Sequence, residues 1–197
     1  MSWSEIFSYK VANIVSLILS YPIIGIFEMI FLGLLENANL SIILIGIVLH
    51  SLLPVIAPLI YGIYNSGDLY VSRREHRPLL FIPGIMSYIL AAEIFYNLGF
   101  KRLFCLEMIS IFTSILLLCF SLKLKVSIHV ASITIPVFFF YLLGFVQAVL
   151  LSPLILLVSW ARIRLSAHNL MQIFIGFIIG LTSTFLSFYF VFDMSRN

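Results

Sequence analysis

The sequence contains few charged residues. Only 10% of its 197 residues are Asp, Glu, Lys or Arg, whereas 62% are hydrophobic. Soluble domains have about 25% charged residues. The mean hydropathy of +1.18 is too high for a soluble core, and several apolar runs reach the roughly 20 residues that cross a hydrocarbon layer. This composition excludes a soluble globular protein and predicts an integral membrane protein.

Cysteine, polar linkers and repeats are scarce or missing as well. The two cysteines, Cys105 and Cys119, occupy one apolar run. In a helix they would stand about 21 Å apart, which is too far for a disulfide. No low-complexity tract or long polar segment divides the chain, so we expect a single integral-membrane domain over 1–197. The basic residues behind the net charge of +3 lie almost all in connections, where lipid headgroups, phosphate or membrane topology explain them better than a nucleic-acid surface.

The apolar runs predict an all-α fold of about six to seven transmembrane helices in one bundle. Prolines within the first two spans predict a kink at Pro22 and local unwinding near Pro54 and Pro58. The expected spans are 11–35, 40–64, 79–98, 103–122, two short helices within 130–160, and 170–192.

Three polar breaks, at 65–78, 123–129 and 161–169, are separated by two predicted spans each, so they should meet on one side of the membrane. Asp68 and Glu75 are their only acids, too few for a metal-dependent hydrolase at this face. Their cations and imidazoles predict metal-free phosphoryl transfer, although binding of anionic lipid headgroups and the positive-inside rule offer another explanation. These residues are Arg73, Arg74, Arg77, Lys123, Lys125, Arg162, Arg164, His76, His129 and His168.

The order of these residues resembles the three-part signature of the type 2 phosphatidic acid phosphatase (PAP2) superfamily, in its small membrane branch with a K-x-S-x-H second motif. The matching positions are Arg77-Pro78, then Lys125-Val126-Ser127-Ile128-His129, then Arg162 with His168 and Gly176. The resemblance implies a PAP2-like core over about 65–190 and a membrane phosphatase that needs no metal or cofactor.

The resemblance also implies a role for each matched residue. His168 would be the nucleophile that forms a phosphohistidine, and His129 would protonate the leaving oxygen and then activate water. Gln172 stands where the family has an aspartate that orients the nucleophile, which predicts a slower enzyme. The phosphate-binding residues would be Arg77, Arg162, Ser127 and Lys125, with Arg73 or Arg74 replacing a family lysine whose position holds Tyr70.

The implied substrate is a lipid phosphate or diphosphate, with a polyprenyl carrier first and a glycerolipid phosphate second. Membrane lipids are the other expected partners, and the active face is expected to be cytoplasmic in the cell membrane. Two alternatives stay open. One is a PAP2-like lipid-binding or scaffold protein without activity, and the other is a UbiA-like prenyltransferase suggested by Asn65, Asp68 and Arg77-Pro78.

Three glutamates and one histidine fall inside predicted spans: Glu28, Glu93, Glu107 and His50. We expect His50 to be a packing histidine, and we expect the glutamates to pair inside the bundle or to be protonated in lipid, although a polar channel is the alternative.

Overall fold

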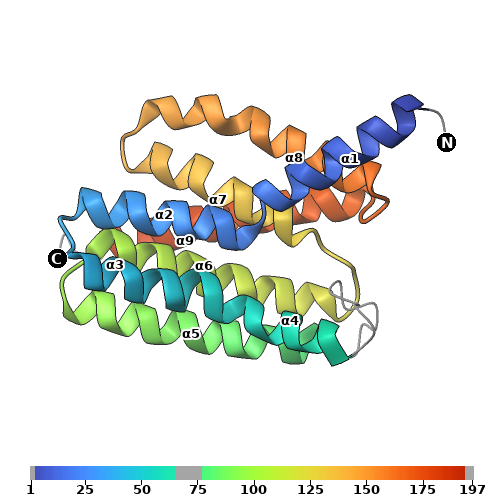
Figure 1. Ribbon diagram of the computed structural model, residues 1–197. Helices are drawn as coiled ribbons and strands as arrows, with labels where there is room; N and C mark the ends of the chain where they lie inside the picture. The colour runs from blue at the N-terminus through green and yellow to red at the C-terminus, as the bar shows by residue number, and fades with distance from the viewer. Residues whose placement is uncertain (1–2, 65–76, 194–197) are drawn as a thin grey trace.

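The computed structural model describes residues 3–64 and 77–193, and these residues form helices joined by short connections. Figure 1 shows the helices packed side by side along one common direction. The elements are α1 (Trp3–Ile18), α2 (Tyr21–Leu35), α3 (Leu40–Gly46), η1 (Ile47–Leu52), α4 (Leu53–Tyr64), α5 (Arg77–Asn97), α6 (Lys101–Ser121), α7 (Ile128–Leu142), η3 (Val146–Leu151), α8 (Ser152–Arg164) and α9 (Leu170–Asp193).

The predicted all-α membrane bundle is confirmed. Among the described residues, 5 helical segments are long and apolar enough to cross a membrane, and the bent pair α1 and α2 makes up to 6. Helix α7 is apolar but shorter. The five long segments are Leu40–Tyr64, Leu80–Asn97, Lys101–Ser121, Val146–Arg164 and Leu170–Asp193.

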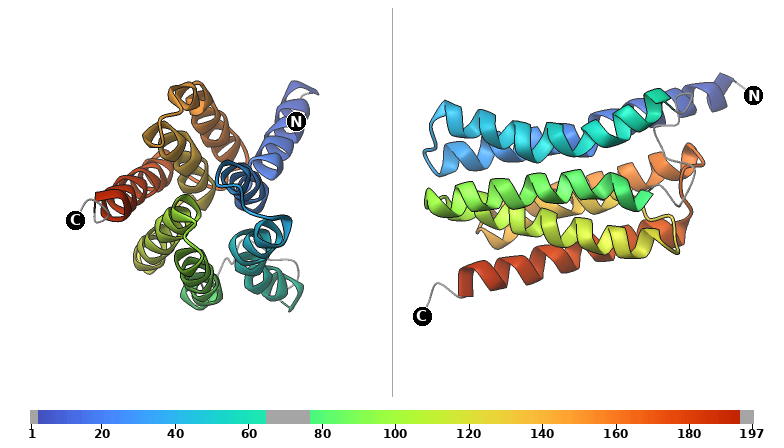
Figure 2. Two further views of the ribbon diagram at one scale, coloured as in Figure 1. Left: turned by 90° about the vertical axis from the view of Figure 1, so that its left-hand side faces the viewer. Right: turned by 90° about the horizontal axis from the view of Figure 1, so that it is seen from below.

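The first predicted span, 11–35, is bent by 41° between α1 and α2. Pro22 lies in the first turn of α2, where its missing N–H costs nothing but its ring prevents a continuous helix from α1. Helix α1 therefore leaves the direction of α2 and packs on α8. In the end-on view of Figure 2, α1 lies at the edge of the bundle.

The second span departs from α-helical geometry just before Pro54, where η1 is π-helical, whereas its second half, with Pro54 and Pro58, is α-helical and not unwound as predicted. Pro54 has no N–H to donate to the carbonyl of His50, four residues earlier. The hydroxyl of Tyr21 donates to that carbonyl instead. The neighbouring Leu49 carbonyl accepts from the Ser87 hydroxyl. Side chains of α2 and α5 thus satisfy backbone groups that the proline and the π-helical turn release.

Helices α7 and α9 pack closely because two glycines of α9 face the backbone of α7. A Cβ atom added at Gly176 would lie 2.5 Å from the carbonyl oxygen of Ser127. One added at Gly180 would lie 2.5 Å from that of Ala131. Small residues at such spacing allow close helix approach in a membrane. This contact fixes the start of α7 beside the start of α9.

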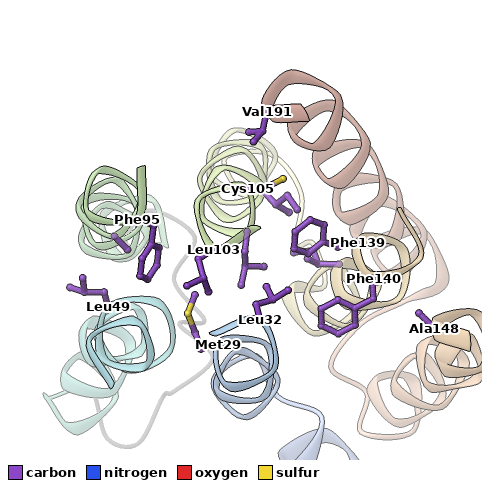
Figure 3. Close-up of a cluster of buried hydrophobic side chains, with 14 residues drawn as sticks. Met29, Leu32, Leu49, Phe95, Leu103, Cys105, Phe139, Phe140, Ala148 and Val191 are labelled. Atoms are coloured by element: carbon purple, nitrogen blue, oxygen red, sulfur yellow. The ribbon is translucent and has the colours of Figure 1, made fainter. Parts of the chain in front are cut away.

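At the other end of the bundle, a large apolar cluster fills the space between the helices. Figure 3 shows Met29, Leu32, Phe95, Phe139 and Phe140 converging from α2, α5 and α7. Four of these side chains are fully buried, and Phe140 is 4% exposed. The buried side chains of this cluster therefore pack densely at this end of the bundle.

Replacement of Gly176 by alanine tests the α7–α9 contact. Helix propensity alone would favour alanine by about 1 kcal/mol, but the added methyl would collide with the Ser127 carbonyl. We expect Gly176→Ala to destabilise the protein by about 1–3 kcal/mol, measured as a lower midpoint of thermal unfolding in detergent. Thr182→Ala, at an exposed position of the same helix, should leave the midpoint unchanged. An unchanged midpoint for Gly176→Ala would contradict the close approach.

Candidate functional site

Two of the three predicted polar breaks lie at the same end of the bundle. Figure 1 shows the connection between α6 and α7 beside the connection between α8 and α9. His129 lies in the first turn of α7, and His168 lies just before α9. The convergence predicted for 123–129 and 161–169 is therefore confirmed. The third break, 65–78, lies almost wholly outside the described residues.

A cavity of about 330 Å³ extends from this end into the bundle. Lys125, His129, Arg162 and His168 line it together. Its remaining walls are mainly apolar, with scattered hydroxyl groups. These walls come from α2, α4, α5, α6 and α7 and include Pro22, Pro54, Pro58, Leu80, Phe81, Leu117 and Ile135. The cavity thus combines a cationic end with an apolar interior. Such a cavity is suited to bind an amphipathic anion.

Arg162 is the largest fully buried side chain of the described residues, with 2% of its surface exposed. Its Nη1 donates a hydrogen bond of 2.8 Å to the hydroxyl of Ser16 on α1. The ring of His129 also hydrogen bonds the backbone of Ser16. Ser16, which is 5% exposed, therefore contacts two residues of the site from a distant part of the chain. The sequence does not mark Ser16 as a site residue, since its only signal is one hydroxyl in an apolar run.

The His168 ring is held by Gln172, one turn into α9. The ring Nδ1 lies 3.1 Å from Oε1 of Gln172. The backbone N–H of Asn169 donates to the same oxygen at 3.3 Å, and the Gln172 N–H donates to Oδ1 of Asn169 at 3.0 Å. Because the amide oxygen only accepts, this contact requires the tautomer with the proton on Nδ1, in which Nε2 has the lone pair. Gln172, in the position of the family aspartate, thus contacts the ring of His168.

Burial lowers the pKa of His168 from its ordinary value of 6.5 to about 4. The positive charge of Arg162 contributes next, and that of Lys125 acts in the same direction. Hydrogen bonds to Gln172 and to the Lys125 backbone oppose the shift. His168 is therefore neutral at pH 7. An imidazole must be neutral to act as a nucleophile or as a general base.

The other predicted phosphate-binding residues lie in different places. Ser127 is fully buried and faces α9 at Gly176, outside the lining of the cavity. Arg77 begins α5, but its side chain lies outside the described residues, as do Arg73 and Arg74. Phosphate contacts by these four residues stay predictions.

Comparisons with protein-family models, with curated proteins and with solved structures found no match.

The protonation of His168 can be measured directly. Because its pKa is lowered to about 4, its ring should stay neutral as the pH falls through 6 and take up a proton only near pH 4. Histidine NMR of selectively labelled protein in micelles, with the His168 signal assigned by its loss in His168→Gln, reports this titration. Titration near the ordinary value of 6.5 would contradict the buried, cationic environment.

Proposed function

We propose that the chain is a membrane phosphatase of PAP2 type that hydrolyses a lipid phosphate or diphosphate through a phosphohistidine. One observation carries the proposal: His129, His168 and Arg162 line the same cavity. Two imidazoles beside a guanidinium provide a nucleophile, a proton donor and an oxyanion-binding group in one place. The order of His129, Arg162 and His168 along the chain, which resembles the PAP2 signature, adds support.

In the first step, the Nε2 lone pair of His168 attacks the phosphorus of the bound ester. The phosphorus–nitrogen bond forms as the bond to the lipid oxygen breaks, and His129 gives its proton to that oxygen. Arg162 and Lys125 bind the phosphate oxygens. The phosphate brings negative charge next to His129, which favours the protonated imidazole that this step needs.

In the second step, neutral His129 takes a proton from water, and the water oxygen attacks the phosphohistidine. The phosphorus–nitrogen bond breaks, inorganic phosphate leaves, and His168 returns to its neutral form. The two steps together need only these side chains and one water molecule, and no atom changes its oxidation state.

The apolar walls support a lipid tail as the other half of the substrate. Leu80, Phe81 and Leu117 line the cavity on the side of α5 and α6, so that a chain attached to the phosphate can extend between the helices. A polyprenyl phosphate is our first candidate and a glycerolipid phosphate the second. We place the site on the cytoplasmic face of the cell membrane.

A phosphate-release assay tests this function. Purified protein in micelles is given a polyprenyl phosphate, a polyprenyl diphosphate or phosphatidate, each with and without EDTA. We expect release that resists EDTA, that His168→Ala abolishes and that Lys125→Gln reduces. Lys123→Gln is the matched control, because Lys123 is exposed and does not line the cavity.

Each other outcome favours one of the alternatives. Activity that EDTA removes would indicate a metal-dependent enzyme and would contradict the metal-free mechanism. No activity on any lipid phosphate would favour the scaffold protein. Equal activity of wild type and His168→Ala would contradict the histidine mechanism.

Gln172 limits the rate in this proposal. A neutral amide orients the His168 ring, as the 3.1 Å contact indicates, but it cannot stabilise the imidazolium-like charge that develops during attack. Removing the orienting carboxylate of a triad enzyme costs about 10⁴-fold in kcat. We therefore expect Gln172→Asp to raise kcat by about tenfold or more, with little change in KM.

Gln172→Leu, which removes the hydrogen bond, should lower kcat below that of wild type. Steady-state kinetics of wild type, Gln172→Asp and Gln172→Leu measure these changes in kcat and KM. A Gln172→Asp enzyme no faster than wild type would contradict an orienting role for this position.

A further inference from the structure

A second group of ionisable residues lies in the middle of the bundle. Glu28 of α2, His50 of η1 and Glu107 of α6 are 3%, 0% and 0% exposed. The His50 Nδ1 lies 3.0 Å from Oε1 of Glu107, and its Nε2 lies 3.8 Å from Oε2 of Glu28. Glu28 and Glu107 therefore pair with His50 inside the bundle, as expected. Glu93 is instead exposed on α5.

The backbone is shaped around this cluster. A Cβ atom added at Gly25 would lie 2.9 Å from Cδ2 of His50 and 2.7 Å from Oγ of Ser51, so that only glycine lets η1 approach α2 so closely. The imidazole itself belongs to the π-helical turn. Such turns are frequent at functional sites. These features exceed what packing of one histidine needs.

Several polar atoms of the cluster have unused hydrogen-bonding capacity. Among the described residues, Oε1 of Glu28, Oε2 of Glu107, Nε2 of His50 and Oγ of Ser51 are buried without a hydrogen-bond partner. A buried polar atom left in this state is costly. The cost falls when a proton converts a carboxylate oxygen into a hydroxyl that can donate. These atoms are therefore groups that an added proton can occupy or to which it can be donated.

Charge identifies that ligand as the proton. With both carboxylates ionised and the imidazole neutral, the cluster would carry two negative charges away from water, which is expensive. Two bound protons neutralise it. A metal ion fits less well, because the imidazole stands between the carboxylates and no set of three His, Cys, Asp or Glu residues in the described part of the chain is arranged to hold one.

Two tyrosines separate the cluster from the cavity. Tyr21 and Tyr88 both line the cavity, and their ring centres lie 5.7 Å and 5.6 Å from that of His50. The Tyr88 hydroxyl donates to the Tyr21 hydroxyl at 2.7 Å, which in turn donates to the His50 carbonyl. The titratable groups facing His50 are therefore Glu28 and Tyr21 from α2, Tyr88 from α5 and Glu107 from α6.

We propose that Glu28, His50 and Glu107 form a proton-binding site inside the membrane, and that protons reach it from the cavity past the hydroxyls of Tyr21 and Tyr88. The protein then takes up protons from the same side of the membrane as the ligand of the cavity. This inference goes beyond the proposed function and does not depend on phosphate release.

Infrared spectroscopy tests the bound protons. Wild-type protein in lipid nanodiscs at pH 7 should show the carbonyl band of a buried, protonated carboxylic acid. Glu28→Gln or Glu107→Gln should remove it, and because Gln has the shape of a protonated Glu, both variants should fold. Glu93→Gln is the control that should leave the band unchanged. A wild-type spectrum without this band, or a band that disappears on adding sodium ions, would overturn the proposal.

Exchange into D₂O tests the route. Tyr88→Phe keeps the ring but removes the hydroxyl, so the shift of the carboxylic acid band in D₂O should become severalfold slower. Tyr96→Phe, at a position of α5 that is 68% exposed, should exchange like wild type. Equal exchange rates for Tyr88→Phe and wild type would overturn entry from the cavity. Failure of the phosphatase assay would not affect either measurement.

Discussion

A buried guanidinium organises the functional end of this bundle. Arg162 is 2% exposed in a chain with only 10% charged residues, and burial of a charge is costly unless polar groups or a ligand compensate it. Ser16 supplies one such contact. The charge in turn helps to keep His168 neutral by lowering its pKa. An anion in the cavity would meet the guanidinium and both imidazoles together, which is why the placement of Arg162 governs the chemistry we propose.

Other parts of the fold determine which side chains lie near Arg162. The bend before Pro22 turns α1 towards α8 and brings Ser16 to the arginine. The glycines of α9 bring its start against the start of α7, so that His168 and His129 share one cavity. The large aromatic cluster of Figure 3 closes the opposite half of the bundle. The cavity with its cationic side chains lies towards the other end, and η1 adds the buried cluster around His50.

Much of this arrangement follows from the sequence. Long apolar runs predicted the helices, and the even number of spans between polar breaks predicted that His129 and His168 share one end. The proline positions predicted the bend in the first span, whereas the irregular turn in the second lies just before Pro54. Other features depend on three-dimensional contacts without a local signal. Ser16 is an ordinary hydroxyl until α1 folds onto α8, and Ser127 turns towards Gly176 instead of lining the cavity because of the close α7–α9 contact.

Trapping the covalent intermediate tests the account most directly. Protein mixed with a polyprenyl phosphate labelled with ³²P at phosphorus is quenched in alkali, which preserves phosphohistidine, and the labelled peptide is then identified. The account predicts label on His168 in wild type, none in His168→Ala, and accumulation in His129→Ala where hydrolysis of the intermediate is slowed. Phosphate release from wild type without any label on His168, or with the label on another residue, would contradict it.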